Sequence, residues 1–368
     1  MAAAIAQKNP IEFVGGILEH GHDLQSCLGT DHERDIAFQE IQNSRKNGVV
    51  LDAYSVWTAA TINVLDIIEA LLGPIFIPQS VRDDLLIFRG FEDFQRSDSM
   101  SLVHRGGQFY RTENDRESID ARNTYVSQQI EKIEITCSVS PVVAPNQLSP
   151  LEDTVLENCN EHVLDAIFLC AEDHLLISED LRYRQFAAET ASVKSLWLHA
   201  IILFARDQGI ISEDRYTEAV VNLASLKHSP LAIDARLLRS ALARDSSRDL
   251  LSFNVVARCI GNANADYISH AGVVREFIDA TYADRALDRL VRQRAVSAVL
   301  RNLIRLSSDE AWPFIIAMVI DNLNSDDRSY VYGWVKGHFL NPKTLHEVEK
   351  QLKAGRRQDK SDQRLGKN

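Results

Sequence analysis

The stretch Gly48-Val49-Val50-Leu51-Asp52 is an apolar run that ends on an acid, and Ala53-Tyr54-Ser55-Val56-Trp57 opens a helical pattern directly after it. A short apolar run of this kind is typical of a buried strand. A carboxylate at the end of the strand lies at the carboxyl edge of the sheet, where open α/β sheets bind their ligands. The stretch therefore predicts an α/β fold with a functional edge at Asp52.

A second segment repeats this arrangement far downstream. Leu175-Leu176-Ile177-Ser178-Glu179-Asp180 runs from apolar residues into acids, and a new helical pattern follows it. Ile75–Ile77 reads as a third short strand, with a helix over Val81–Phe88 after it. Right-handed crossovers place the carboxyl ends of parallel strands on one side of a sheet. The topology is therefore expected to gather four acids, which are Asp52, Asp84, Asp165 and Asp180.

The composition is that of an ordinary globular protein. The chain has 368 residues, of which 45% are hydrophobic and 25% charged, and its formal net charge is −12. This charge argues against a protein that coats nucleic acid by bulk attraction. Five dispersed cysteines without a CxxC motif indicate a reduced, cytoplasmic protein. No signal peptide is recognisable, and no apolar run reaches the roughly 20 residues that span a bilayer, so no membrane partner is expected.

Composition and periodicity divide the chain into four regions. Residues 1–47 are expected to form a helical N-terminal extension, and 48–244 an α/β domain in which 93–150 is a polar insertion with some β structure. Residues 245–353 are predicted to be helical, and the polar tail 354–368 to be disordered. Within the α/β domain, Val56–Leu72 reads as one long apolar helix.

Four carboxylates packed together raise one another's pKa unless a cation neutralises them. Mg²⁺ and Mn²⁺ prefer carboxylate oxygens, and either can polarise a phosphoryl oxygen and activate water. Phosphodiester hydrolysis is the chemistry that fits. Each acid taken alone is more often a helix cap or a surface residue, and Asp83 competes with Asp84 for the second position. The set of four favours the metal site.

The segments that carry these acids resemble the motifs of PIN-domain nucleases over about residues 48–240. They are Val49-Val50-Leu51-Asp52-Ala53, Ile77-Pro78-Gln79-Ser80-Val81-Arg82-Asp83-Asp84-Leu85, Leu164-Asp165-Ala166 and Leu176-Ile177-Ser178-Glu179-Asp180. The resemblance implies a three-layer α/β/α fold around a parallel sheet, and Mg²⁺- or Mn²⁺-dependent cleavage of RNA that leaves a 5′-phosphate and a 3′-hydroxyl.

The resemblance also assigns roles by matching position. The catalytic, metal-binding acids would be Asp52, Asp84, Asp165 and Asp180. Ser178 would support Asp180 by hydrogen bonding, and Arg182 and Arg184 would lie near the substrate backbone. The family usually carries Glu at the second acidic position, where this chain has Asp84. The long insertion and the helical region after residue 245 exceed a minimal PIN domain.

Two functions from different classes follow. The first is a metal-dependent endoribonuclease with an appended helical domain, acting as a toxin or defence effector and restrained by a protein regulator or antitoxin. The alternative is a PIN-like protein that has lost efficient catalysis and docks a partner through its C-terminal helices. Whether the protein forms a homo-oligomer is left open, because no self-complementary face is readable.

Two further signals compete with these readings. The residues His20, His22, Cys27 and His32 are of zinc-binding type, but their spacing matches no established zinc motif. The arginines of 285–305 could contact RNA phosphates, or they could form solvated faces and ion pairs with neighbouring acids.

Overall fold

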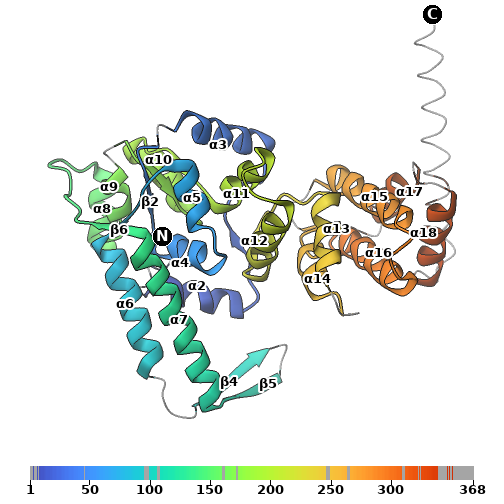
Figure 1. Cartoon of the computed structure of the whole chain (residues 1–368), viewed down its shortest axis with the longest axis horizontal. Coiled ribbons are helices and arrows are strands. Elements are labelled where there is room, and N and C mark those ends of the chain that lie inside the picture. Colours follow the sequence, from blue (N-terminus) through green and yellow to red (C-terminus); the bar gives the residue numbers. More distant parts are fainter. Residues whose placement is uncertain are drawn as a thin grey trace, which may run out of the picture. The chain divides into compact units, whose positions relative to one another are not determined.

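The computed structural model of the chain divides into two compact units, which are described separately (Figure 1). The first comprises Met1–Ser212 with Leu226–Ser229, and the second Glu213–Ser225 with Pro230–Asn368. The structure describes residues 3, 6, 8–44, 46–94, 99–105, 108–159, 162–170, 173–245, 249–262, 266–308, 311–321, 323, 325–338, 346, 348 and 350. The tail 354–368, predicted to be disordered, lies outside them. The division falls earlier than the predicted boundary near residue 245.

The centre of the first unit is a five-stranded parallel sheet in the order β6-β3-β2-β7-β8. Its strands are β2 (Val49–Leu51), β3 (Ile75–Pro78), β6 (Cys137–Ser140), β7 (Leu175–Ile177) and β8 (Ser195–Leu196). The chain builds outward from β2 through β3 to β6, and then returns to the other side of β2 with β7. The neighbours β2 and β7 therefore mark the switch point of the sheet, where α/β proteins bind ligands. The three strands predicted from the sequence are confirmed.

Helices cover both faces of this sheet. Val50 and Leu176 pack against α9 (Asp165–Leu169) and α10 (Leu181–Ala191) on one face. Successive side chains of a strand point to opposite faces, so Val49 and Leu51 face the other layer, and both are 0% exposed. A strand buried on both sides explains why its sequence is continuously apolar. The predicted three-layer α/β domain is confirmed.

Gly48 sets the entry into β2. Its backbone has φ of 107°, a conformation that residues with a Cβ rarely adopt. A Cβ at this position would lie 2.6 Å from the Phe76 ring and 2.7 Å from the carbonyl oxygen of Pro74. The glycine therefore allows β2 to start directly beside β3.

The apolar segment after Asp52 forms two helices rather than the single one that the sequence predicts. They are α4 (Ala53–Thr61) and α5 (Leu65–Leu72), and they are bent by 112°. Asn63, with φ of 59°, makes the break. Among the described residues no single helix is long and apolar enough to cross a membrane, and α4 and α5 meet that test only as a bent pair.

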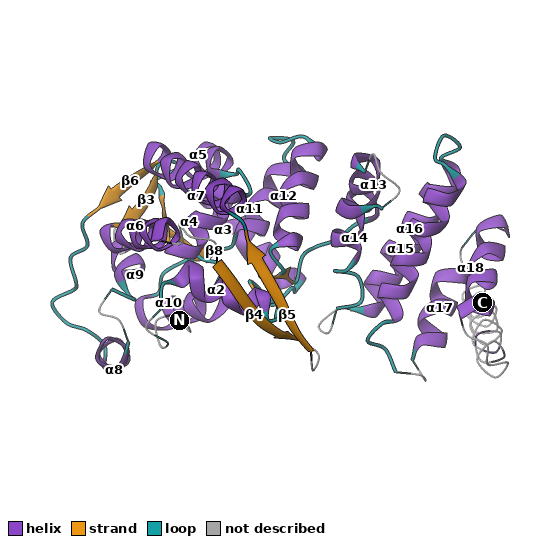
Figure 2. Ribbon diagram, turned by 90° about the horizontal axis from the view of Figure 1, so that it is seen from below, coloured by secondary structure: helices purple, strands orange, loops and turns teal. Residues whose placement is uncertain are grey.

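The predicted insertion, 93–150, contains a hairpin and completes a helical arm whose first helix precedes it. The arm pairs α6 (Gln79–Phe94) with α7 (Arg116–Thr136), and the antiparallel hairpin of β4 (Ser99–Arg105) and β5 (Gln108–Asn114) joins their ends (Figure 2). Directly after α7, β6 enters the main sheet, and α8 (Pro150–Asn158) follows. Region 93–150 thus supplies a core strand, because α7 packs against α4 and returns the chain to the sheet edge.

The N-terminal extension packs onto the α/β domain through α2 (Pro10–Glu19), β1 (Leu24–Gln25) and α3 (Asp31–Asn43). Strand β1 pairs in parallel with β9 (His228–Ser229). Helix α3 packs against α11 (Leu198–Asp207), where the rings of Phe38 and Phe204 meet edge to face at 5.3 Å. The extension is therefore mostly helical, as predicted, and fixed to the domain at several points.

The second unit is helical throughout its described part. Its helices are α12 (Glu213–Ser225), α13 (Ala235–Arg244), α14 (Leu251–Ala257), α15 (Tyr267–Ala283), α16 (Arg289–Ile304), α17 (Trp312–Asp321) and α18 (Ser325–His338). The stacked rings of Phe253 and Phe277, 5.4 Å apart, join α14 to α15 in the core. Helices α12 and α13 pack against α14, which places the division before residue 213.

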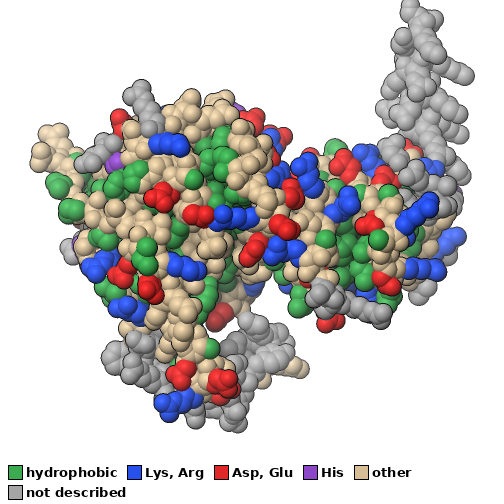
Figure 3. Space-filling model, viewed as in Figure 1, with side chains coloured by type: hydrophobic (Ala, Val, Ile, Leu, Met, Phe, Trp, Pro, Cys, Tyr) green, Lys and Arg blue, Asp and Glu red, His purple; other side chains and the backbone are tan. Residues whose placement is uncertain are grey.

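The arginines around α16 hold this unit together in part. Arg292 donates to the carbonyl oxygens of Asp284 and Leu287 and stacks over the Tyr282 ring. Arg305 donates to the Asn262 side chain. On the face of the helical unit in Figure 3, basic and acidic side chains are intermingled. These contacts favour the reading of solvated faces and internal pairs over a basic stripe for RNA.

Candidate functional site

Asp52 and Asp180 occupy equivalent places on the two strands at the switch point. Asp52 follows β2 directly, and Asp180 follows β7 after Ser178 and Glu179. Each has an extended backbone and caps the next helix. Asp52 accepts a hydrogen bond from the Ser55 N–H at 2.8 Å. Asp180 accepts from the N–H groups of Arg182 and Tyr183 at 2.9 and 3.1 Å. The capping role and the site role are therefore filled by the same residues.

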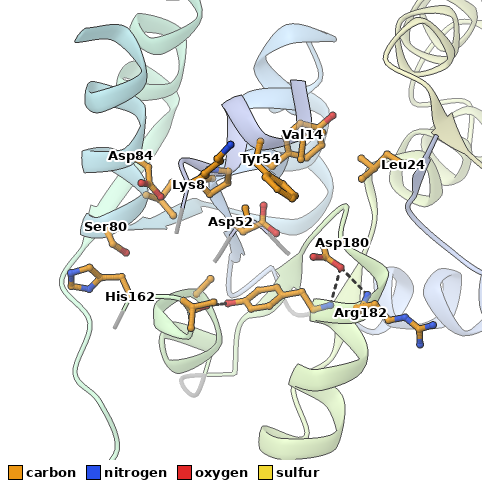
Figure 4. Close-up of a pocket in the computed structure, with 18 of the residues that line it drawn as sticks. Lys8, Val14, Leu24, Asp52, Tyr54, Ser80, Asp84, His162, Asp180 and Arg182 are labelled. Carbon is orange, nitrogen blue, oxygen red and sulfur yellow. Dashed lines mark hydrogen bonds between the residues drawn. The ribbon is translucent and has the colours of Figure 1, made fainter. Parts of the chain in front are cut away.

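All four predicted acids line one cavity of about 330 Å³ at this edge of the sheet (Figure 4). Asp52 lies in the middle, with Asp84 to one side and Asp180 to the other. Asp84 is half-buried on α6, while its neighbour Asp83 is exposed and accepts from the Gln79 side chain at 2.8 Å. The structure thus brings Asp84, and not Asp83, to the cavity.

Asp165 is held at the cavity wall by two side chains. The Ser80 hydroxyl donates to its Oδ2 at 2.6 Å, and the His162 Nδ1 lies 3.2 Å from the same oxygen. Ser80 belongs to α6 and Asp165 to α9, so this contact joins the helices that follow β3 and β6. Neither Ser80 nor His162 was singled out as a site residue from the sequence, although Ser80 stands within one of the motifs.

Burial disfavours the charged forms of two of the cavity acids, Asp52 and Asp84, whereas the pKa of Asp180 is lowered. Burial raises the pKa of Asp52, which hydrogen bonds from Ser178 and Ser55 partly offset and the nearby Asp180 reinforces. Burial also raises the pKa of Asp84 to about 6, an increase that His162 reduces and Asp83 enlarges. No lysine or arginine of the described chain forms an ion pair with Asp52 or Asp84.

Ser178 is buried behind the acids and connects them. Its hydroxyl accepts from the Asp180 N–H at 3.2 Å, and its side chain is hydrogen-bonded to Asp52. The support that the sequence predicts for Asp180 is therefore present as a contact with the backbone of that residue. Ser178 also links the two strand ends at the switch point.

The two arginines that were predicted to lie near the substrate occupy different environments. Arg182 is exposed, lines the cavity and donates to the Gln185 side chain at 3.0 Å. The Arg184 side chain is 5% exposed, donates to the Ser178 carbonyl at 2.7 Å and lies 3.5 Å from Glu33. It also stacks over Trp197. The structure corrects the expectation for Arg184. Its position on α10 directs the side chain to the buried side of the loop that contains Ser178, and it does not line the cavity.

A buried polar network behind the site was missed from the sequence. The side chains of Glu179 and His228 are both 0% exposed, with Oε2 and Nδ1 2.6 Å apart. Glu179 Oε1 accepts from the Leu198 N–H at the start of α11, and the Glu179 N–H donates to Ser55. The His228 Nε2 lies 3.3 Å from the hydroxyl of Tyr54, which reaches the cavity. Only the adjacency of Glu179 to Asp180 signalled it, because His228 lies far along the chain.

The wall opposite the acids is apolar and comes from the N-terminal extension. Along α2, Pro10, Phe13, Val14 and Ile17 recur at helical spacing and line the cavity, and Leu24 of β1 continues this wall. Lys8, just before the helix, is exposed and also lines it. Nothing in the sequence of the extension indicated that it would complete the site.

The donor set is of the kind that a hard divalent cation prefers, since all four acids offer carboxylate oxygens in one half-buried cavity. The elevated pKa of Asp52 and of Asp84 shows that these groups gain from a nearby positive charge. Among the residues described, no three acids, histidines or cysteines already stand close enough to hold a metal, and this includes the described histidines and cysteine near the N-terminus. The residue types fit the cation, and the carboxylates would have to draw together around it.

A comparison with protein families agrees with this geometry. A family model described as a PIN domain associated with the TPR-GreAB-C-PIN system matches residues 50–189. The match contains all four acids and Ser178, and it excludes α2. No curated protein and no solved structure matches the chain significantly. The resemblance seen in the sequence is confirmed over residues 50–189, and the chain contains a PIN-like α/β domain together with a helical C-terminal region.

Proposed function

We propose that the protein is a metal-dependent endoribonuclease that hydrolyses RNA phosphodiester bonds at the cavity of Asp52. The observation that carries the proposal is the gathering of four carboxylates around one cavity at the switch point. PIN domains are generally nucleases. Two of the four acids, Asp52 and Asp84, have raised pKa values and would gain from a cation. With a cation bound, an RNA phosphate would be attracted to a site that the acids alone would repel.

Mg²⁺ or Mn²⁺, held by Asp52, Asp84, Asp165 and Asp180, would supply Lewis acidity and lower the pKa of a bound water. The chain's own residues position these acids. Ser178 fixes the turn that carries Asp180 and steadies Asp52, while Ser80 and His162 orient Asp165. At the rim, the exposed Arg182 guanidinium can donate to phosphate oxygens.

The test is incubation of the purified protein with single-stranded RNA and Mn²⁺ or Mg²⁺, beside the Asp52→Asn and Asp83→Asn variants. We expect cleavage by the wild type and by Asp83→Asn, since Asp83 is exposed outside the cavity. Asp52→Asn should lose on the order of 10³-fold in rate, because metal-bound charge stabilisation is worth several kcal/mol and each 1.36 kcal/mol is a factor of ten. Equal cleavage by wild type and Asp52→Asn would rule out this site.

One observation favours the alternative, a PIN-like interaction protein with weak or absent catalysis. The described acids do not form a ready coordination group, and the second acid is the short Asp84. In that case the helical unit would dock a protein partner, and the description of the matched family, which names a TPR-containing system, is consistent with such partners. Absence of Mn²⁺ binding by calorimetry, together with absence of cleavage, would select this alternative. The role as a toxin or defence effector rests on the family resemblance.

A further inference from the structure

We propose that helix α2 forms a nucleobase subsite of the cavity, so that the protein takes one unpaired nucleotide with its base on α2 and its phosphate at the acids. The inference rests on the proposed function for the phosphate side. It assigns a new role to the N-terminal extension, which lies outside the residues that match the PIN family. The specific contact residues would be Phe13, Val14 and Ile17.

Helix α2 is fixed in place at both ends. At its start, Asn9 caps the helix through its side-chain oxygen, and its side-chain nitrogen donates to the Asp84 carbonyl at 2.8 Å. At its end, the Lys227 ammonium donates to the Leu18 carbonyl. Beyond the helix, β1 is paired with β9. These contacts fix α2 in place, so it forms a permanent wall of the cavity and not a mobile lid.

The apolar face of α2 is not packed into the core. Ile11 is the buried residue of the helix, whereas Phe13, Val14 and Ile17 are half-buried and border the cavity. If α2 served only to close the site, its side chains would fill the space next to the acids. Instead, a cavity of about 330 Å³ remains between α2 and the acids. Apolar side chains that border an open cavity leave apolar surface in contact with water, and a ligand with an apolar face would remove that surface from solvent. The wall is therefore built for an occupant.

The two walls differ in chemistry in a way that matches a nucleotide. The acids offer a cation site and hence a place for phosphate, while the opposite wall offers an aromatic ring and aliphatic side chains. Unpaired bases are recognised by stacking on such aromatic side chains. The cavity is near the lower end of ligand pockets, about 300–1,000 Å³, which suits a single nucleotide and excludes a base pair. An unpaired nucleotide is therefore the occupant that we infer.

The test measures the contribution of the base to binding, apart from catalysis. Adenosine 5′-monophosphate and ribose 5-phosphate are titrated into the full chain with Mn²⁺ by calorimetry. We expect the wild type to bind the nucleotide about tenfold more tightly, within the range of base–aromatic stacking. Phe13→Ala should bring this ratio close to one. Leu18→Ala, on the same helix but outside the cavity, should leave it unchanged.

A second variant separates a wall from a lid. Gly16 lies within α2 with open space around its missing Cβ, so Gly16→Ala stabilises the helix without a clash. For a fixed wall, the affinity for the nucleotide should be unchanged or higher. Weaker binding in Gly16→Ala, or tighter binding in Phe13→Ala, would show that α2 must open and would overturn the inference.

The outcomes also separate the inference from the proposed function. Equal wild-type affinity for the two phosphates, together with RNA cleavage, would refute the base subsite and leave the nuclease standing. If neither phosphate binds with Mn²⁺, the metal-dependent function fails, and the base subsite fails with it.

Discussion

Asp52 and Glu179 stand at the ends of the neighbouring strands β2 and β7, and both carboxyl groups are withdrawn from solvent, but their pKa values move in opposite directions. The pKa of Asp52 is raised by burial. Burial also acts to raise the pKa of Glu179, but His228, the Leu198 N–H and Arg184 outweigh it, so the pKa is lowered. The protein itself stabilises the charged form of Glu179, whereas burial disfavours the charged form of Asp52.

The difference teaches how to tell a structural acid from a site acid. Glu179 is fully buried and Asp52 is half-buried at the cavity, yet both follow an apolar run, so sequence context does not separate them. Partners decide, because a buried charge is tolerated only when paired or hydrogen-bonded. The Glu179 network stabilises the switch point, whereas burial leaves the pKa values of Asp52 and Asp84 raised.

The largest expected effect comes from breaking the paired side of this comparison. His228→Ala leaves Glu179 charged and buried without its ring partner, which should lower the free energy of unfolding by about 3–5 kcal/mol. Chemical denaturation at pH 7 measures it. A loss below 1 kcal/mol would mean that the network does not support the fold of the site.

Removing the charge of a cavity acid should instead raise the free energy of unfolding. Asp84 has a folded pKa of about 6 against an ordinary value of 3.8, so the folded state binds the extra proton between these values and loses stability as pH rises through them. Asp84→Asn should therefore raise the free energy of unfolding by roughly 2 kcal/mol at pH 7.5, and by little at pH 3.5. The exposed Asp83→Asn is the matched control, with no comparable gain expected.

The raised pKa of Asp84 should also appear in the pH dependence of metal affinity. The acids must lose their protons to bind a cation, so Mn²⁺ affinity should fall as pH drops below about 6, by about tenfold per unit for one proton released. Calorimetric titration from pH 5 to 8 measures this, and Asp84→Asn should weaken the dependence. A flat profile would argue against Asp84 as a ligand.

The smallest effect is expected at an exposed ion pair whose N–O distance is similar to that of the His228–Glu179 pair. Lys194 and Glu40 are 2.7 Å apart, and the Lys194 side chain is 62% exposed. Lys194→Ala should change the free energy of unfolding by less than about 1 kcal/mol. A loss as large as that of His228→Ala would mean that burial does not explain the strength of the Glu179 network.

Local sequence patterns predicted a good part of this protein. Short apolar runs that end in acids identified β2 and β7, and their common edge followed from the handedness of crossovers. Strand β8 was missed, and the β structure expected in 93–150 was not assigned to the main sheet, since a short strand at the side of a sheet leaves little periodic signal. The prediction of a single helix over Val56–Leu72 was wrong. Asn63 has a left-handed backbone conformation that interrupts the helix, and the apolar composition of the segment gives no sign of this break.

The sequence by itself determined the α/β class, the switch-point strands and four acids that lie at one edge of the sheet, because these depend on local hydrophobicity and on the direction of parallel strands. Only the tertiary structure decided that Asp84 rather than Asp83 reaches the cavity, that Arg184 is buried, and that His228 lies against the Glu179 carboxylate. Only it placed α2 opposite the acids. These outcomes depend on contacts between segments far apart in the chain, whose geometry no local pattern encodes.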